Sequence, residues 1–453
     1  MHATAGLAAD VAPRALRGAY LTSRGDPFTE GSDATLHYDA DGIVAIAAGR
    51  IVDAGPAAEV LQRLPHGTLV ERLPAHSLLV PGFVDCHVHY AQLAVIASWG
   101  AQLLDWLERY TFPAELALAD ADRARATARL FFDATLACGT TTAAAFCTVH
   151  AASVDAFFEE AARRRVRAIA GKVLMDRHAP AALVDTAQQG YDASKALIAR
   201  WHGVGRLGYA ITPRFAPTSS PAQLEAAGTL WREHPDCWVQ SHIAENRREL
   251  AWVRELFPDA ADYAAVYERF GLLGRRAIYG HGIHLSEREL ASFAQTHTAI
   301  AHCPTSNLFL GSGVFRWRRA KRHERAVRVG LGTDVGGGTS LSMLTTAAEA
   351  YKVAQMAGST LSPAHLFDLM TRGGAEALDL ADRVGAIEPG MDADLVVLDL
   401  HATPLLAQRV AHAGSLDELL FALVMLGDDR CVQTTIVDGA NAWRRDAPLS
   451  PPA

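Results

Sequence analysis

The feature that most constrains the fold is an alternation of short apolar segments with long helical ones between about residues 78 and 380. The short segments are rich in β-branched residues, and the stretches between them are rich in Ala, Leu, Arg and Glu. Such alternation is typical of βαβ units around a parallel sheet. Eight parallel strands separated by helices predict a (β/α)8 TIM-type barrel. The predicted strands are Leu78–Val84, Thr141–Cys147, Val166–Leu174, Gly208–Thr212, Trp238–His242, Ala277–Tyr279, Thr298–His302 and Val327–Gly332.

The two ends of the chain share a different texture. Residues 35–55, 385–400 and 431–443 consist of short β-rich runs broken by turn dipeptides such as Asp-Gly and Ala-Gly, a pattern that predicts hairpins. We therefore expect an α/β protein whose barrel is inserted into a small β-sandwich domain formed from both chain ends. The expected division assigns 1–76 and 385–453 to the β domain and 77–384 to the barrel.

Charge and composition argue against several classes of function. The 453 residues carry 42 Lys+Arg against 50 Asp+Glu, a net charge of −8, whereas nucleic-acid-binding domains are usually basic. The basic cluster at 316–322 is expected to be solvated surface. No apolar run approaches the roughly 20 residues of a membrane helix, and the six scattered cysteines, without C-x-x-C, are typical of a reduced cytosolic protein. We expect a cytoplasmic protein that binds neither nucleic acid nor membrane.

Histidines stand at the ends of several predicted strands. His87 and His89 close the first strand, and because side chains alternate between the faces of a strand, both point the same way. His242 closes the fifth strand, His281 follows the sixth and Asp334 follows the eighth. In a barrel, the carboxyl ends of the strands form the active site. These five side chains are therefore predicted to meet there.

Three imidazoles and one carboxylate suit a single zinc ion with a position left for water, although iron and other divalent ions also bind imidazole. Zinc lowers the pKa of bound water to about 7, which favours hydrolysis at neutral pH. The predicted ligands are His87, His89, His242 and Asp334.

Proton transfer in a hydrolytic site needs a further side chain. Glu245, one turn beyond His242, is the predicted general acid/base, and Asp334 can share this work as the base that takes the water proton. His281 is either a further ligand or a hydrogen-bond partner of the hydroxide. Lys172, in the third predicted strand, would bridge two metals if it were carbamylated, but we favour one metal.

Several segments resemble the amidohydrolase superfamily: PGFVDCHVHYAQ (81–92), SHIAEN (241–246), HGIHLS (281–286), AHCPTSN (301–307) and GTDVGGGTSLSML (332–344). LLDWLERYTFPAE (103–115) and ITPRF (211–215) are similar to its guanine deaminase branch. The resemblance implies the same metal ligands, catalytic roles for Glu245 and His281, and substrate recognition by Gln92, Arg214 and Phe215.

The activity that the resemblance implies is hydrolysis of guanine to xanthine and ammonia by a homodimer. Gln92 can donate and accept hydrogen bonds, Arg214 can donate to a ring carbonyl, and Phe215 offers a flat apolar wall. The alternatives are a barrel hydrolase of another amino-heterocycle, such as 8-oxoguanine, another aminopurine, a pterin or a triazine, and a catalytically dead scaffold. The H-x-E…P-C-x-x-C pattern of deaminases that act on flipped bases is absent.

Overall fold

The computed structural model describes residues 13–99, 102–322 and 326–446. Within these residues one sheet is parallel and forms a barrel, with strand order β14-β13-β12-β11-β10-β8-β7-β6 and β9 paired to β10. This confirms the predicted (β/α)8 architecture. The strands are β6 (Phe83–His89), β7 (Thr140–Phe146), β8 (Arg167–Gly171), β9 (Val173–Leu174), β10 (Leu207–Pro213), β11 (Trp238–Ile243), β12 (Ala277–His281), β13 (Ala299–His302) and β14 (Arg328–Leu331).

The barrel closes through backbone hydrogen bonds just beyond its last strand. The N–H of Asp334 donates to the carbonyl of His87 over 2.8 Å, and the N–H of His89 donates to the carbonyl of Val335 over 3.0 Å. These bonds join the segment after β14 to the end of β6. The closure therefore lies at the carboxyl ends of the strands, between two segments that carry predicted site residues.

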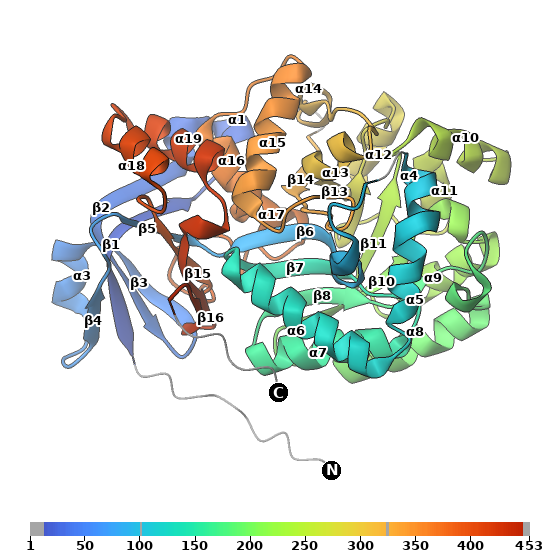
Figure 1. Cartoon of the computed structure of the whole chain (residues 1–453), viewed down its shortest axis with the longest axis horizontal. Coiled ribbons are helices and arrows are strands. Elements are labelled where there is room, and N and C mark those ends of the chain that lie inside the picture. Colours follow the sequence, from blue (N-terminus) through green and yellow to red (C-terminus); the bar gives the residue numbers. More distant parts are fainter. Residues whose placement is uncertain (1–12, 100–101, 323–325, 447–453) are drawn as a thin grey trace, which may run out of the picture.

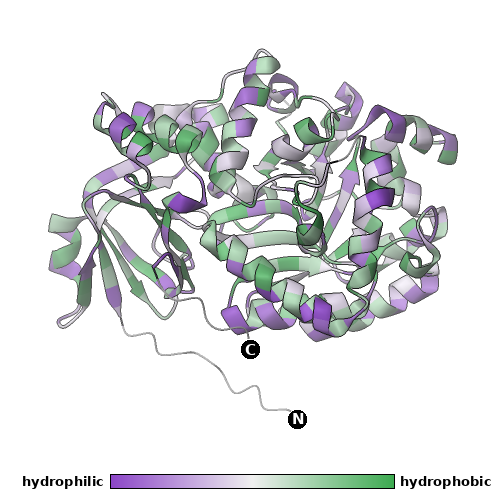
Figure 2. Cartoon of the chain, in the orientation of Figure 1, coloured by the Kyte–Doolittle hydropathy of each residue, from purple (hydrophilic) through white to green (hydrophobic). Residues whose placement is uncertain are grey.

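Helices surround the barrel (Figure 1), and their hydrophilic residues alternate with apolar ones while the strands inside are mostly hydrophobic (Figure 2). Several of these helices begin with a side chain that caps the first backbone N–H groups, as in the capping boxes Asn246–Glu249 and Ser286–Glu289. The helical segments of this part are η1 (Tyr90–Val95), α4 (Leu103–Trp106), η2 (Leu107–Thr111), α5 (Phe112–Ala117), α6 (Ala121–Ala137), α7 (Ala151–Arg164), η3 (Ala181–Leu183), α8 (Ala187–Trp201), η4 (Ala216–Thr218), α9 (Pro221–Glu233), α10 (Arg247–Leu256), α11 (Tyr263–Arg269), α12 (Glu287–Thr296), α13 (Pro304–Phe309), α14 (Trp317–Ala320), α15 (Met343–Met356), α16 (Pro363–Met370) and α17 (Arg372–Ala377).

The two ends of the chain meet in a second, mixed sheet, where the blue and red strands of Figure 1 lie together. Its central pairing is antiparallel, between β5 and β15, with Leu395 opposite Pro81. The predicted extra β domain is thus one continuous sheet, and the division at residues 77 and 385 stays a prediction. The strands are β1 (Arg14–Ser23), β2 (Leu36–Ala47), β3 (Arg50–Pro56), β4 (Leu69–Arg72), β5 (Ser77–Pro81), β15 (Leu395–Asp399), β16 (Val432–Val437) and β17 (Ala440–Arg444). The helices beside this sheet are α1 (Pro27–Glu30), α2 (Ser32–Thr35), α3 (Ala57–Arg63), α18 (Pro404–Ala411), α19 (Leu416–Leu426) and η6 (Asp429–Cys431).

The predicted strand Leu78–Val84 is wrong as a single barrel strand, because the chain passes from one sheet to the other within it. β5 belongs to the mixed sheet and β6 begins the barrel at Phe83. Gly82 lies between them, donates its N–H to the carbonyl of Asp394 over 2.8 Å, and would place a Cβ only 2.1 Å from Oγ1 of Thr141. Glycine permits this close approach, which a hydrophobic pattern alone does not reveal.

Other expectations concern the surface. No helix in the described ranges is long and apolar enough to cross a membrane. In the basic cluster at 316–322, Arg316, Arg318 and Arg322 are exposed as expected. Lys321 is instead partly buried, with its ammonium 4.6 Å from the ring centre of Phe28.

Buried ion pairs connect the barrel to the mixed sheet. Arg206, just before β10, donates from Nη1 to Oδ1 of Asp394 over 2.9 Å and from Nη2 to its Oδ2. Arg167, the first residue of β8, donates to Asp392, which precedes Asp394 by two residues. The Asp394 side chain is 1% exposed and that of Arg206 is 12% exposed. Without the Asp394 carboxylate, Arg206 would keep, among the described residues, only the longer ion pair of its Nη2 with Oδ2 of Asp392, at 3.3 Å, and breaking a buried ion pair is strongly destabilising.

Replacing Asp394 with Asn should therefore lower the free energy of unfolding by about 3 kcal/mol, measured by urea unfolding. The matched control is Asp122→Asn, because Asp122 pairs with Arg125 at a side chain that is 90% exposed, where a change within about 0.5 kcal/mol is expected. Equal effects of the two substitutions would show that the buried pairs do not hold the two sheets together.

Candidate active site

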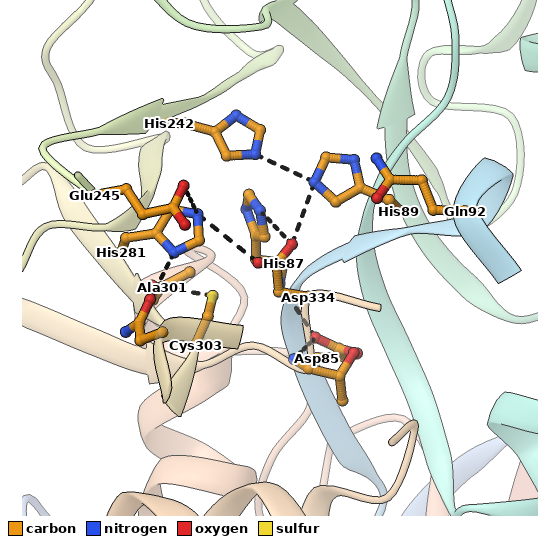
Figure 3. Close-up of polar contacts among 12 residues, drawn as sticks. Asp85, His87, His89, Gln92, His242, Glu245, His281, Ala301, Cys303 and Asp334 are labelled. Atoms are coloured by element: carbon orange, nitrogen blue, oxygen red, sulfur yellow. Dashed lines mark hydrogen bonds and ion pairs between the residues drawn. The ribbon is translucent and has the colours of Figure 1, made fainter. Parts of the chain in front are cut away.

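The predicted site residues meet at the carboxyl ends of the barrel strands. His87 and His89 come from β6, His242 from β11 and His281 from the end of β12, while Asp334 lies three residues after β14. Figure 3 shows these side chains converging on one space. His281 and Asp334 adopt left-handed backbone conformations, with φ of 72° and 49°. Such conformations are costly for residues other than glycine and are concentrated at functional sites.

Four donor atoms have the spacing of a single coordination sphere. Nε2 of His87 and Nε2 of His89 each lie 3.3 Å from Oδ1 of Asp334, and Nε2 of His89 lies 3.2 Å from Nε2 of His242. Zinc–ligand bonds of about 2.0–2.1 Å in a tetrahedron place neighbouring donors about 3.4 Å apart. Nε2 of His87 is buried without a hydrogen-bond partner among the described residues. These four residues therefore form a group that could hold a metal ion.

In His242 and His281 the Nδ1 atom is hydrogen-bonded to a neighbouring oxygen, so the Nε2 atom is free to act as an acceptor or a metal ligand. Nδ1 of His242 lies 2.7 Å from the carbonyl of Arg214, so Nδ1 carries the proton and Nε2 presents a lone pair to the group. Nδ1 of His281 lies 2.9 Å from Oδ1 of Asn307, which leaves its Nε2 facing Glu245 and Asp334 at 3.3 and 3.8 Å. His281 is thus placed beside the donor group and the acid/base candidate, at Oδ2 of Asp334.

The two carboxyl groups of the site differ in their electrostatic environment. Burial, together with the nearby charge of Asp334, raises the pKa of Glu245 to about 8, although the hydrogen bond from Ser312 opposes this shift. Burial also opposes ionisation of Asp334, but the imidazoles of His87 and His89, each with Nε2 3.3 Å from its Oδ1, hold its pKa well below the ordinary value. At neutral pH, Glu245 therefore keeps a proton while Asp334 is an anion, the division expected of an acid and a base in one site.

Burial keeps the imidazoles neutral. It lowers the pKa of His89 to about 4, and burial with the neighbouring imidazoles lowers the pKa of His242 well below its usual value. Neutral imidazole is the form that ligates metal ions. The cluster thus combines three neutral nitrogen donors with one anionic oxygen.

A cavity opens beside this cluster and is lined by all three predicted substrate residues, Gln92, Arg214 and Phe215. Leu103, Trp106 and Leu310 supply an apolar wall of the same cavity, and these three side chains pack together in one cluster. The site thus combines polar groups at its base with flat and apolar surfaces around it, as ligand sites usually do.

Lys172 and Cys303 lie on or next to barrel strands but do not belong to the four-residue donor group. Nζ of Lys172 donates to the carboxylate of Asp185 and to the carbonyl of Val173, so the carbamylated two-metal alternative gains no support. Cys303 lies near His281 and Asp334, but its thiol donates to the carbonyl of Ala301 over 3.4 Å (Figure 3).

The sequence did not predict three residues that contact the site. Glu115 binds Arg214 and Gln92, Ser312 donates to Oε1 of Glu245 over 3.0 Å, and Asn307 binds His281. Glu115 and Asn307 stand within segments that carry the family resemblance, which was a usable signal. Ser312 stands in a Gly-Ser-Gly turn with no such signal.

Comparisons with known proteins identify the family of this chain. The Amidohydrolase family model matches residues 78–441. Guanine deaminase of Escherichia coli (strain K12) is 45% identical over 434 residues, covering 96% of this chain and 98% of the relative. The solved structure of E. coli guanine deaminase superposes with a TM-score of 0.92 at 44% identity, covering 96% of this chain and 100% of that one. Guanine deaminase from C. acetobutylicum with bound guanine gives 0.85 at 28% identity, covering 95% and 100%. The chain belongs to the amidohydrolase family.

Proposed function

We propose that this protein is a metal-dependent guanine deaminase that converts guanine and water to xanthine and ammonia. The observation that carries the proposal is the meeting of the metal-type donor group, the buried Glu245 and the three substrate residues around one cavity. Relatives that match nearly the whole chain are guanine deaminases, and the C. acetobutylicum enzyme has guanine in its active site. Fold alone would not indicate an activity, but a complete site on the fold does.

The proposed ligands of one divalent ion are His87, His89, His242 and Asp334. Zinc is the proposed metal because three imidazoles and a carboxylate are a common zinc set, and iron and other divalent ions remain alternatives. When bound, such an ion lowers the pKa of its water to about 7. The spacing of the donors and the orphaned Nε2 of His87 support this assignment.

Proton transfers follow from the charge states of the two carboxyl groups. Asp334, an anion, accepts a proton from the attacking water at Oδ2, the oxygen nearer His281. Nε2 of His281 accepts a hydrogen bond from the same water. Glu245 donates its proton to the ring nitrogen beside the amino-bearing carbon as the water oxygen bonds to that carbon. The proton taken up by Asp334 then passes to the exocyclic amine, which leaves as ammonia, and the remaining hydroxyl proton returns to Glu245 as the second carbonyl of xanthine forms. Ser312 holds Oε1 of Glu245 during this exchange.

Substrate binding is proposed to use the residues around the cavity. Arg214 donates to the ring carbonyl, Gln92 hydrogen-bonds the ring edge and Phe215 lies against the face of the ring. The apolar wall of Leu103, Trp106 and Leu310 limits access of bulk water. Homodimer assembly and cytoplasmic location stay predictions from the sequence, and the proposed reaction would belong to purine breakdown.

Wild-type protein should release one ammonia per guanine, and Glu245→Gln should lower kcat by about 1000-fold or more, because an amide cannot shuttle the proton. An ammonia-release assay measures both, with metal content followed in parallel. The matched control is Glu225→Gln, at a side chain that is 57% exposed, which should behave as wild type. A Glu245→Gln protein with normal turnover would contradict the assigned role, and guanine left intact by the wild type would contradict the proposed function.

Metal binding should weaken when the His87 ring is displaced. Gly280 on β12 has no side chain, and a Cβ there would lie 2.7 Å from Cε1 of His87. Gly280→Ala should therefore weaken metal affinity by about 10- to 100-fold, as loss of ligand orientation does in other sites. The control is Gly414→Ala, whose nearest contact would be 4.0 Å away. Elemental analysis after dialysis distinguishes the two, and equal metal content in both variants would count against His87 as a ligand.

A further inference from the structure

A buried carboxylate outside the cavity lining accepts hydrogen bonds from two residues that line the substrate cavity. Glu115 is 0% exposed. Nη1 of Arg214 donates to both of its oxygens, over 2.7 and 2.8 Å, and Nε2 of Gln92 donates to Oε1 over 3.0 Å. The ring of Phe112, one turn earlier on α5, lies 5.8 Å from the guanidinium carbon of Arg214. The short helix α5 therefore contacts Arg214 through both Glu115 and Phe112, and contacts Gln92 through Glu115.

This contact fixes which hydrogen-bonding groups the cavity presents. An ionised carboxylate only accepts hydrogen bonds, so the amide of Gln92 must turn its NH₂ toward Glu115. The carbonyl oxygen Oε1 of Gln92 is then the part of the amide left for a ligand. Arg214 uses Nη1 for Glu115 and keeps Nη2 and Nε as donors. Since both side chains line the cavity, its wall offers an acceptor from Gln92 beside donors from Arg214.

We propose that Glu115 is a positioning residue that sets this polarity, so that the site binds ring edges with an N–H next to a C=O. Guanine and hypoxanthine carry this edge. Adenine carries the reverse pattern, a ring nitrogen acceptor next to an NH₂ donor. Its edge would set acceptor against acceptor and donor against donor, leaving buried polar groups unpaired, which is strongly unfavourable. The inference rests on the proposed function and narrows its substrates to lactam-containing heterocycles.

Hypoxanthine and adenine both lack an amino group at the carbon that reacts in guanine, so their binding can be measured without deamination. Calorimetry on the metal-loaded wild type should show hypoxanthine binding at least about 100-fold more tightly than adenine. In Glu115→Gln the new amide can donate as well as accept, so Gln92 is free to turn either way. The preference should then fall below about tenfold, mainly through weaker hypoxanthine binding, with metal content unchanged.

A matched control is Glu289→Gln, which removes the charge of another buried glutamate, one that caps α12 through Ser286 and lies outside the cavity lining. It should keep the wild-type preference. Adenine binding to the wild type as tightly as hypoxanthine would overturn the proposed polarity without any variant, including the case in which Glu115→Gln does not fold. A folded, metal-loaded Glu115→Gln protein with the wild-type preference would overturn the role of Glu115.

Ammonia release from guanine by the same wild-type preparation separates this inference from the proposed function. Release together with an unchanged preference in Glu115→Gln contradicts the positioning role alone. Absence of release contradicts the proposed function whatever the ligand preference.

Discussion

The close approach of three imidazole nitrogens and one carboxylate oxygen, at 3.2–3.3 Å, is the constraint on which the rest of the structure depends. Buried polar groups normally need hydrogen-bond partners, and Nε2 of His87 has none in the described chain. Backbone bonds between the segment after β14 and the end of β6 hold the donors in place. Asp85, one layer below, accepts hydrogen bonds from the N–H groups of His87 and Thr333. The closure of the barrel and the shape of the site are therefore one feature.

Differences in their neighbours, rather than in burial, shift the pKa values of two carboxyl groups near one imidazole in opposite directions. Asp334 has histidine neighbours that stabilise its negative charge, whereas Glu245 has chiefly the hydroxyl of Ser312 and lies near a like charge. The difference in pKa follows from these neighbours rather than from residue type. The same logic applies at Arg214, where the buried Glu115 supplies the counter-charge and also sets the direction of Gln92.

Strand alternation and the position of strand ends were sufficient to predict the barrel and to bring the proposed ligands together. These features depend on local sequence, with a period of two along a strand and a known active-site face. The passage of the chain between sheets at Gly82 was not predictable in this way, since it depends on contacts with Thr141 and Asp394. Ser312 was missed for the same reason, since it meets Glu245 across 67 residues. Glu115 lies in a segment that carries the family resemblance, but its contact with Arg214, across 99 residues, is not visible in that segment.

The central claim, that one metal held by the strand-end donors supports deamination of guanine, is tested most directly by reconstitution. Zinc is titrated into chelator-treated protein while ammonia release from guanine is measured. We predict that the rate rises linearly and reaches a plateau at about one zinc per chain, as expected for a single four-residue donor group. A rate independent of added metal, or one that rises until two ions per chain are bound, would contradict this account.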